Sequence, residues 1–502
     1  MSSAGARTRV ASVDVAIIGA GAAGLAAARE LRQAGYSRVL LLEATERVGG
    51  RVRDGTIDAC GFRLPVELGP EFVHGAEANP LLEALVEMGC MMRTLEWPNY
   101  YYFGKEGALL DGETAGVLPE MAAMHRTFDA LEGLVPERTR EQSLLQHFVE
   151  AGLPSRVLDM ADAIYANDYG AELSSIGLRE TIAEQRGWAH GEAYLVADGR
   201  MLSEAMAHLA HGVPLITGFE ASLVEWDARA DDRAARVRVV DTTGREVACR
   251  RLVVTVPLAC LQRGALAFVP PLPATKARAI ERVRVGNALK VAVALARPIW
   301  PARFWDAVCA DCAFPEIWLT PPGDAADAHG RQEGKPYVLV AFVSGERSER
   351  LAALADAELV RLLLAQLDAM FGSADEPKPA SSQCVGQLVC SWRDQPYAWG
   401  AYSHPTLGAL GARRTIGEPL GGLGGIVHFA GEAVNLAVNP CVHGAMSTGI
   451  DAAHAVRASL ALEDAAGVGH AARHAVARSR AALGCALLAA ALLVARALRK
   501  VA

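Results

Sequence analysis

An apolar strand that runs directly into a glycine-rich turn constrains this chain more than any other feature. The apolar run Val13–Ile18 is followed by Gly19-Ala20-Gly21-Ala22-Ala23-Gly24, and a helical pattern then continues to Gly35. A second apolar run, Val39–Leu42, ends on the acidic residue Glu43. A strand, a glycine turn, a helix, a second strand and an acid in this order predict a βαβ unit that binds a dinucleotide.

Each position of the turn has a physical task in such a unit. Gly19 permits the tight turn, Gly21 lets the backbone approach a pyrophosphate, and Gly24 lets the helix pack closely on the strand. The N–H groups at the start of the helix face the anion, which assigns Ala22 and Ala23 to the same site. Glu43 stands where a carboxylate accepts hydrogen bonds from a ribose 2′-hydroxyl, and it would repel the 2′-phosphate of NADP. The alternative is a glycine-rich turn that binds no ligand.

The next eight residues indicate which dinucleotide is bound. Ala44 follows the ribose acid, and the run Arg47-Val48-Gly49-Gly50-Arg51 resembles the second FAD motif of flavin-containing amine oxidases and related FAD oxidoreductases. Two consecutive glycines let a second stretch of backbone reach the diphosphate, and Arg51 offers a planar, permanently charged fork for it. Nicotinamide dehydrogenases do not need this second clamp, so we expect FAD.

Composition is typical of a globular protein with more than one domain. The 502 residues, 51% of them hydrophobic and 21% charged, can bury the cores of two domains. The net charge is −8 without a long basic run, so nucleic acid is not expected as a partner. The ten cysteines are scattered, and only Cys309 and Cys312 have metal or redox spacing. We therefore expect free thiols in a reducing compartment and no metal site. The first strand has no apolar signal segment before it, so a cytoplasmic protein is expected.

The order of the helical and strand patterns predicts an α/β fold of two interleaved domains. One is a Rossmann-like FAD-binding domain, and the other is a mixed α+β substrate-binding domain. Residues 80–205 have a mostly helical pattern, residues 215–257 are rich in strand formers, and a helix is expected over residues 349–367. The FAD-binding domain would comprise residues 1–79, 211–289 and 406–462, the substrate-binding domain residues 80–210 and 290–405, and a tail residues 463–502.

The C-terminal tail leaves two alternatives open. Residues 481–495 are apolar apart from a glycine and a cysteine, and Arg496, Arg499 and Lys500 follow them. This stretch is shorter than the roughly 20 residues that span a bilayer, although flanking arginines extend its reach by snorkelling. One alternative is a helix docked on the protein or frayed, and the other is a helix through which the protein contacts a membrane.

Four further segments occur in the order that is found in one family. They are Glu67–Gly75, Val285–Val291, Ser391–Ser403, and Phe429–Glu432 with Val442–Gly449. With the FAD motifs they extend from residue 13 to about residue 458, and on them the chain is identified as a member of the flavin-containing amine oxidase family. The resemblance is greatest to the polyamine oxidase branch. The histone demethylase branch is disfavoured, because the chain has no long paired-helix insertion.

The resemblance implies roles for individual residues. Lys290 matches the lysine that reaches the flavin N5 atom through a water molecule. Trp392 and Tyr402 match residues that line the flavin, and His74 either contacts the amine or caps a turn. These four are the candidate catalytic residues. The further cofactor contacts that the resemblance implies are Leu68, Gly69, Pro70, Glu71, Ala221, Val256, Gly431, Glu432 beside the ribityl chain, Cys441, Val442 at the start of a helix that faces the flavin pyrimidine, and Ala445.

Two departures from monoamine oxidases affect the expected site. Those enzymes carry a cysteine immediately before the cage tyrosine when their flavin is covalent, and this chain has Ala401 there. FAD is therefore expected to be bound non-covalently. Cys441 stands where monoamine oxidases have the second tyrosine of an aromatic cage. The pocket is therefore expected to be aromatic on one side only, with room for longer or bulkier amines.

The resemblance implies an FAD-dependent amine oxidase. A primary or secondary amine, polyamine-like or aryl-alkyl, would pass a hydride to flavin N5, and the imine would hydrolyse to an aldehyde and a smaller amine or ammonia. Oxygen would reoxidise the flavin and release hydrogen peroxide. An apolar pocket would lower the pKa of the amine and so favour the neutral form, which alone can lose a hydride. The alternatives are an FAD-dependent desaturase or porphyrinogen-type oxidase, and a flavoprotein that has lost turnover.

Overall fold

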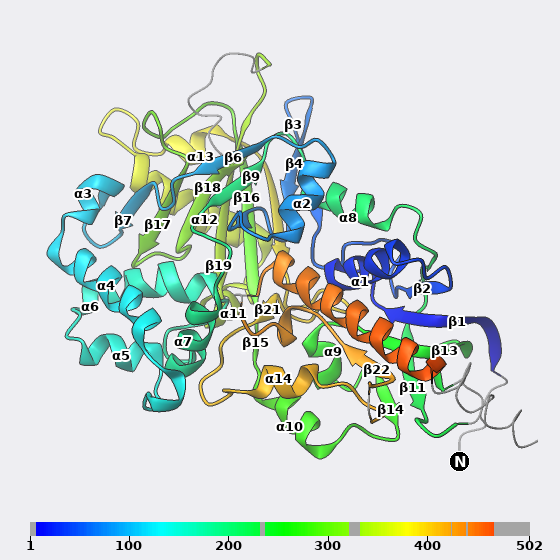
Figure 1. The fold of residues 1–502 in the computed structure, drawn as a ribbon. Helices are drawn as coiled ribbons and strands as arrows, with labels where there is room; N and C mark the ends of the chain where they lie inside the picture. Colours follow the sequence, from blue (N-terminus) through cyan, green and yellow to red (C-terminus); the bar gives the residue numbers. More distant parts are fainter. Residues whose placement is uncertain (1–6, 231–235, 321–331, 423, 438–439, 466–502) are drawn as a thin grey trace, which may run out of the picture.

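The computed structural model describes residues 7–230, 236–320, 332–422, 424–437 and 440–465 (Figure 1). Their strands form two large sheets, of eight and of seven strands, and three small ones. Each large sheet joins segments that lie far apart in the sequence. This arrangement is the mixed α/β fold with a parallel, Rossmann-like sheet that the sequence predicts.

The eight-stranded sheet is built around the N-terminal βαβ unit. Its order is β10-β2-β1-β13-β12-β11-β14, with β22 paired to the C-terminal end of β13. The strand β12 runs antiparallel to β11 and β13, and the other pairs are parallel. The strands are β1 (Thr8–Ile18), β2 (Val39–Leu42), β10 (Leu215–Ile216), β11 (Ala221–Trp226), β12 (Val237–Asp241), β13 (Arg245–Val254), β14 (Ala267–Val269) and β22 (Val427–Phe429).

The register of this sheet brings four strand ends together. Ile18 at the end of β1 lies beside Leu42 of β2 and beside Val254 of β13, and Val254 lies beside Phe429 of β22. Because these four strands are parallel, the residues that follow them meet at the same edge. Ligands bind at this edge in open α/β sheets. The first glycine turn, Glu43 and the segment after Phe429 therefore reach one place.

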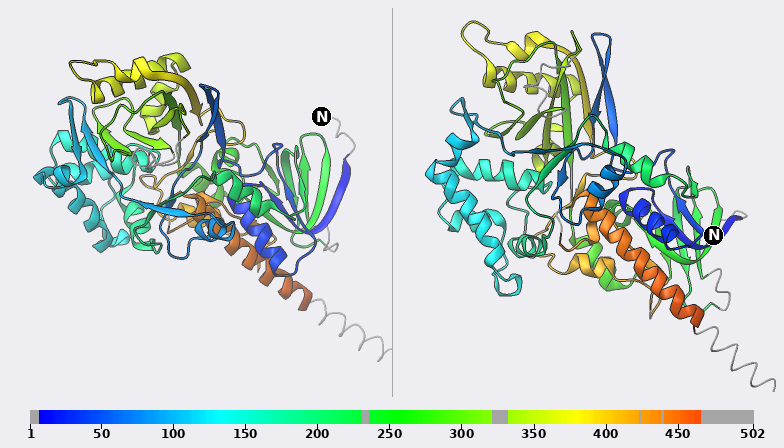
Figure 2. Two further views of the ribbon diagram at one scale, coloured as in Figure 1. Left: turned by 90° about the horizontal axis from the view of Figure 1, so that it is seen from above. Right: turned by 45° about the horizontal axis from the view of Figure 1, so that its top comes forward.

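Two helices pack together on this sheet and direct their N-termini to that edge. The helix α1 (Ala22–Gln33) starts directly after Gly21 and buries an alanine- and leucine-rich face. A long helix over residues 442–465 runs alongside it (Figure 2) and buries Ala453 and Val456 in the same core. At the crossing a Cβ atom on Gly449 would lie 2.1 Å from the carbonyl oxygen of Ala23, so the two backbones touch there.

The seven-stranded sheet carries Lys290 on one face. In the strand β16, which lies between β20 and β19, alternate residues such as Leu289 and Val291 pack against the helix α12 (Asp356–Phe371). Lys290 and Ala292 point to the opposite face, because successive side chains of a strand alternate. The order is β20-β16-β19-β18-β17-β7-β8, formed by β20 (Cys384–Ser391), β16 (Ala288–Leu295), β19 (Tyr337–Ser344), β18 (Glu316–Thr320), β17 (Asp306–Ala310), β7 (Tyr100–Phe103) and β8 (Ala108–Asp111).

A hairpin and a group of helices complete the cover of this second sheet. The hairpin of β3 (Asp54–Ala59) and β4 (Phe62–Glu67) packs Ile57 and Val66 against the Lys290 face. Cyan and teal helices enclose one side of the molecule in Figure 1. They include α3 (Gly112–Gly116), α4 (Pro119–Asp129), α5 (Leu144–Glu150), α6 (Ser155–Ala161), a π-helix over Asp162–Ala166 and α7 (Leu178–Gly187).

The other elements connect these layers. Small sheets are formed by β5 (Val73–His74), β9 (Tyr194–Ala197) and β6 (Met92–Leu95), and by β15 (Val285–Gly286) with β21 (Tyr402–Ser403). The remaining helices are α2 (Pro80–Glu87), α8 (Leu202–Ala210), α9 (Leu258–Gln262), α10 (Ala274–Arg282), α11 (Gly345–Leu351), α13 (Pro379–Gln383) and α14 (Ala412–Gly417).

Two sequence-based expectations about elements were only partly correct. Residues 80–205 contain four strands among their helices, because aromatic and branched residues such as those of β7 pair with β17 of the distant sheet. The helix expected over residues 349–367 is split into α11 and α12 around Ala352–Ala355.

The described residues contain no helix that is long and apolar enough to cross a membrane. Residues 481–495, for which membrane contact was considered, lie outside the described part of the chain.

Candidate active site

A single cavity of about 620 Å³ extends from the ligand-binding edge of the eight-stranded sheet to the Lys290 face of the seven-stranded sheet. It is lined by both glycine-rich turns, by Gly431 and Glu432 after β22, and by the start of the helix over residues 442–465. The predicted residues that line this cavity are Gly19, Gly21, Ala22, Ala23, Glu43, Ala44, Arg47, Gly49, Gly50, Arg51, Leu68, Gly69, Pro70, Glu71, His74, Ala221, Val256, Lys290, Trp392, Tyr402, Gly431, Glu432, Cys441, Val442 and Ala445.

Gly24 is the one predicted site residue that does not line the cavity. A Cβ atom at Gly24 would lie 1.9 Å from the carbonyl oxygen of Gly19, so the helix touches the turn there. Its observed position thus fits the packing task expected from the sequence rather than direct ligand contact.

The two glycine-rich turns form one cradle. The N–H of Gly49 donates to the carbonyl of Ala20 at 2.8 Å, and Gly49 forms an isolated bridge with Gly21. A Cβ atom on Gly50 would lie 3.2 Å from the Cα atom of Gly21. Side chains at these positions would fill the space in which two stretches of backbone N–H groups converge. Such a cradle fits a diphosphate.

Glu43 is fixed at the edge of this cradle by its own neighbourhood. The N–H of Ala20 donates to its carboxylate at 2.8 Å, and the N–H and hydroxyl of Thr45 donate at 2.9 and 2.7 Å. The side chain is buried and lines the cavity. A carboxylate held in this way is oriented for a ribose hydroxyl, which is the part assigned to Glu43 from its position in the sequence.

The two arginines of the second turn have different partners. The guanidinium of Arg47 donates to the carbonyl of Gly50 at 2.6 Å and so braces the turn. Arg51 donates from Nη1 to the carbonyl of Ala401 at 2.7 Å and forms an ion pair with Glu432 at 3.0 Å. The sequence suggested that the whole fork of Arg51 serves a diphosphate. In the structure one arm of this fork is used to connect three segments of the protein.

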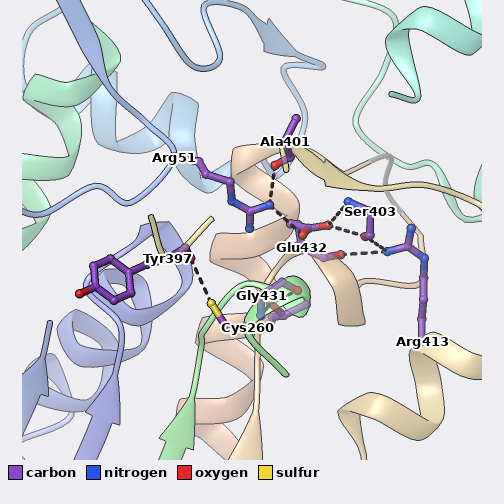
Figure 3. A network of polar contacts seen from close by, with 9 residues as sticks. Arg51, Cys260, Tyr397, Ala401, Ser403, Arg413, Gly431 and Glu432 are labelled. Atoms are coloured by element: carbon purple, nitrogen blue, oxygen red, sulfur yellow. Dashed lines mark hydrogen bonds and ion pairs between the residues drawn. The ribbon is translucent and has the colours of Figure 1, made fainter. Parts of the chain in front are cut away.

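Glu432 is the centre of the polar network shown in Figure 3. Besides Arg51, its carboxylate accepts the hydroxyl of Ser403 at 2.6 Å. Arg413 of α14 donates to the hydroxyl oxygen of Ser403 at 2.9 Å and to the backbone carbonyl of Glu432 at 3.2 Å. The sequence predicts Glu432 and Arg51 as site residues but not Ser403 or Arg413. The latter two come from other segments, and only folding brings them to Glu432.

Lys290 is buried, with 5% of its surface exposed, and its charge is compensated. Its ammonium donates to the carbonyls of Glu67 at 3.0 Å and Gly69 at 2.7 Å. It also lies 3.8 Å from the carboxylate of Glu71 and 5.0 Å from the ring centre of Trp318. Burial lowers the pKa of Lys290, and the neighbouring carboxylates, Glu71 first, act against this shift. These partners explain how an apolar strand tolerates a lysine.

The other three candidate catalytic residues also have defined positions. The indole of Trp392 donates to the carbonyl of Leu68 at 2.9 Å. The hydroxyl of Tyr402 donates to the carbonyl of Asp168 at 3.2 Å, and burial raises the pKa of Tyr402 well above its usual value. The ring of His74 lies edge-on to that of Tyr194 at 4.9 Å, and burial lowers the pKa of His74. A neutral histidine is therefore favoured at this position.

The cavity has more aromatic walls than the sequence suggested. Phe72, Tyr194, Trp318 and Phe342 line it in addition to Trp392 and Tyr402. Cys441 also lines the cavity, at the place where monoamine oxidases have a second tyrosine, so an aromatic pocket on one side only stays a prediction. Trp318 and Phe342 lie on buried strands, where a sequence pattern cannot distinguish cavity walls from ordinary core.

The sequence analysis also missed three acidic residues that line the cavity, which are Asp168, Glu220 and Glu316. Glu316 of β18 and Asp168, which follows the π-helix, line the end that Lys290 occupies. Burial raises the pKa of Glu316 to about 8, and the charge of Asp168 acts in the same direction. The signal in the sequence was weak, since Glu316 begins a short apolar run in which an isolated acid reads as a strand end.

Comparison with known proteins shows the family to which a chain with this site belongs. Residues 22–457 match the model of the family described as Flavin containing amine oxidoreductase. The chain belongs to this family. Family membership implies a flavin, and the glycine cradle, Glu43 and the converging strand ends fit the dinucleotide form of it, FAD.

Individual relatives are more distant. The chain is 28% identical over 470 residues to lysine-specific histone demethylase 1B of Mus musculus, a match that covers 89% of this chain and 53% of the relative. It thus spans about half the length of that demethylase. It is 26% identical over 463 residues to probable polyamine oxidase 4 of Arabidopsis thaliana, with 88% and 86% covered. A structure of wild-type putrescine oxidase bound to putrescine superposes with a TM-score of 0.72 at 21% identity, covering 89% of this chain and 99% of the other. This last likeness concerns the fold alone.

Proposed function

We propose that the protein is an FAD-dependent amine oxidase that converts a primary or secondary amine into an imine, with oxygen as the final electron acceptor and hydrogen peroxide as a product. Hydrolysis of the imine would give an aldehyde and a smaller amine or ammonia. The observation that carries this proposal is the continuity of one cavity from the dinucleotide cradle to Lys290 and the aromatic walls.

FAD supplies the acceptor for the hydride that leaves the carbon next to the amine nitrogen. The residues that would hold it are the two glycine turns for the diphosphate, Glu43 for the ribose and Glu432 for the ribityl chain. We propose non-covalent binding, because residue 401 is an alanine and offers no thiol. The FAD-binding part would comprise residues 1–79, 211–289 and 406–462, and the substrate-binding part residues 80–210 and 290–405.

The chain's own residues orient the amine and keep water away from it. Trp318, Phe342, Tyr402 and Tyr194 supply apolar surface, which lowers the pKa of an enclosed amine and favours its neutral, oxidisable form. Lys290 is held rigidly by two carbonyls and Glu71, so it can position a water molecule at the reacting end of the cavity. These features agree with amine chemistry and leave both polyamine-like and aryl-alkyl amines as substrates.

The test is an anaerobic titration of the purified flavoprotein with polyamines, acetylated polyamines, aryl-alkyl amines and amino acids. Bleaching of the visible flavin absorbance by one of these classes, and peroxide formation when air is readmitted, is the expected result. A flavin that light reduces but no amine reduces would contradict the proposal and favour the desaturase or porphyrinogen-type alternative.

A further inference from the structure

The two cysteines that have redox spacing in the sequence, Cys309 and Cys312, meet in the structure. Cys309 lies on β17, and Cys312 lies in the turn that leads from β17 to β18. Asp311 between them has a φ of 57°, a left-handed conformation that residues other than glycine rarely adopt. The thiols of Cys309 and Cys312 are hydrogen-bonded to each other. Their spacing in the sequence therefore corresponds to a contact between two sulfur atoms.

Further contacts place both sulfur atoms on the side of the sheet that α12 covers. Cys309 is completely buried in the core under this helix, and Cys312 packs against the same core. Both thiols interact electrostatically with the hydroxyl of Tyr102, which lies beside Cys309 on the neighbouring strand β7. Gly104 leaves room for Cys312, because a Cβ atom on Gly104 would lie 2.8 Å from the Cys312 sulfur. The two thiols thus share one small space between β7, β17 and the turn.

Hydrogen bonds hold the turn that carries Cys312. The N–H of Cys309 donates to the carbonyl of Pro315 at 2.7 Å, which closes the base of the turn. The N–H of Phe314 donates to the side-chain oxygen of Gln366 at 3.0 Å, and the side-chain amide of Gln366 donates to the carbonyl of Phe314 at 2.8 Å. Gln366 belongs to α12, so the turn is attached to the helix. A turn held in this way keeps the two thiols within reach of each other, as disulfide formation requires.

The two thiols differ in access. Cys309 is completely buried, whereas Cys312 is partly exposed. Burial, and then the hydrogen bond with Cys312, raise the pKa of Cys309 well above its usual value. An oxidant in solution therefore meets the sulfur of Cys312, and Cys309 is the thiol that waits behind it. An accessible thiol next to a second, resolving thiol is the arrangement found at redox-sensitive cysteines.

We propose that Cys309 and Cys312 are a redox-active dithiol that hydrogen peroxide converts into a reversible disulfide. The sulfur of Cys312 attacks one oxygen of peroxide, the O–O bond breaks, and a sulfenic acid and one molecule of water form. The sulfur of Cys309 then attacks that of Cys312, the S–O bond breaks, and the hydroxyl leaves as a second water with the proton of Cys309. The two thiols lose two electrons, and peroxide gains them.

This inference goes beyond the proposed function. Peroxide is a product of the proposed reaction, so the protein would release the oxidant of its own dithiol, but added peroxide serves equally and no amine is needed. A bridge from Cys309 to Cys312 closes a very short loop, and the stabilisation that a disulfide contributes through the unfolded chain decreases with loop length. The pair therefore fits a reversible modification better than a structural cross-link.

The test treats the reduced, purified flavoprotein with hydrogen peroxide, blocks the remaining thiols by alkylation and examines tryptic peptides by mass spectrometry. Both cysteines fall on one peptide, residues 304–331, and the exposed Cys60 falls on another. We expect the first peptide to become lighter by two hydrogen atoms and to escape alkylation, at a rate at least about five times that at which Cys60 gains oxygen. Dithiothreitol should restore both thiols.

Two variants separate the roles of the pair. In Cys309→Ser the partly exposed Cys312 has no resolving thiol, so it should gain two or three oxygen atoms that dithiothreitol does not remove. In Cys312→Ser the buried Cys309 should stay reduced. Cys60→Ser is the control and should form the bridge as wild type does.

The wild-type peptide alone can overturn the proposal, so the result does not depend on the folding of a variant with a changed core residue. Oxidation of Cys60 while Cys309 and Cys312 both remain alkylated would overturn it, and so would stepwise gain of oxygen at Cys312 with Cys309 still free. Because peroxide is added and no amine is present, either result leaves the proposed function to be decided by the amine titration.

Discussion

Individual side chains in the cavity differ in whether the sequence reveals their task. Glu43 and Lys290 stand in local motifs, so their positions were predicted before any fold was known. Glu316 stands in no motif, and it becomes notable only because β16, β19 and β18 bring it into line with Lys290. Arg413 is similar, since its partners Ser403 and Glu432 are reached through separate loops. Motifs reveal residues whose partners are near in sequence or belong to a ligand, but not those defined by distant segments.

The raised pKa of Glu316 has a consequence for stability in the protein without amine. Its carboxyl holds a proton up to about pH 8 in the folded state, whereas the ordinary value is 4.5. The folded state therefore binds this proton more tightly than the unfolded chain, and the carboxyl destabilises the fold increasingly as the pH rises from about 4.5 to about 8. Glu316→Gln removes this cost. We expect it to raise the free energy of unfolding by on the order of 2 kcal/mol at pH 8 and by much less at pH 5. Urea unfolding at both pH values measures this difference, and an equal effect at both would show that the carboxyl does not titrate in this range.

A second prediction at this scale concerns Arg413, which we expect to position Glu432 and, through it, Arg51. Arg413→Met removes two hydrogen bonds of this network and should weaken FAD binding about tenfold. The adjacent Arg414 is exposed on the same short helix α14, so Arg414→Met is the matched control and should bind FAD as wild type does. Both affinities follow from fluorescence titration of the apoprotein with FAD. Equal losses in the two variants would mean that α14 matters only as a helix.

At the scale of elements, the agreement between sequence and structure depends on where a strand finds its partner. The strand Val39–Leu42 has the bounds expected from its apolar pattern, because local β-propensity and tertiary pairing agree there. The segment over residues 80–205 differs, since its strands are stabilised by partners that are distant in sequence. No local pattern could reveal those partners.

The cradle formed by the two turns leads to a third prediction. Gly21→Val would place a branched side chain between the start of α1 and Gly50, whose Cα atom lies 3.9 Å from the position of a Cβ atom on Gly21. We expect loss of FAD binding by at least a hundredfold with a smaller effect on folding. Gly116→Val in α3 is the control, because nothing lies within 4 Å of a Cβ atom there. The flavin content of the two purified variants, read from their visible spectra, tests this expectation. A yellow Gly21→Val protein with full flavin content would refute the cradle.

At the scale of the whole molecule, the cofactor site is where separate parts of the chain converge. Residues from both glycine turns, the segment after β22, β16 and the helix over residues 442–465 line one cavity, so a ligand there contacts segments from the beginning, middle and end of the described chain. FAD should therefore stabilise the entire fold. With free FAD at 100 times its dissociation constant, the expected gain is about 2.7 kcal/mol. Thermal unfolding of the apoprotein at increasing FAD concentrations measures this gain. A midpoint that does not change with FAD would contradict a site shared by these segments.

The proposed function requires that the carbon next to the amine nitrogen loses a hydride within this cavity. The most direct test mixes the oxidised protein anaerobically with an α,ω-diamine, either unlabelled or carrying deuterium on the carbons next to nitrogen, and follows bleaching of the flavin absorbance. We expect bleaching by both substrates, slower by a factor of at least about two with the deuterated one, because the C–H bond breaks in the step observed. A flavin that neither substrate bleaches, although light reduces it, would show that no amine loses a hydride in this cavity.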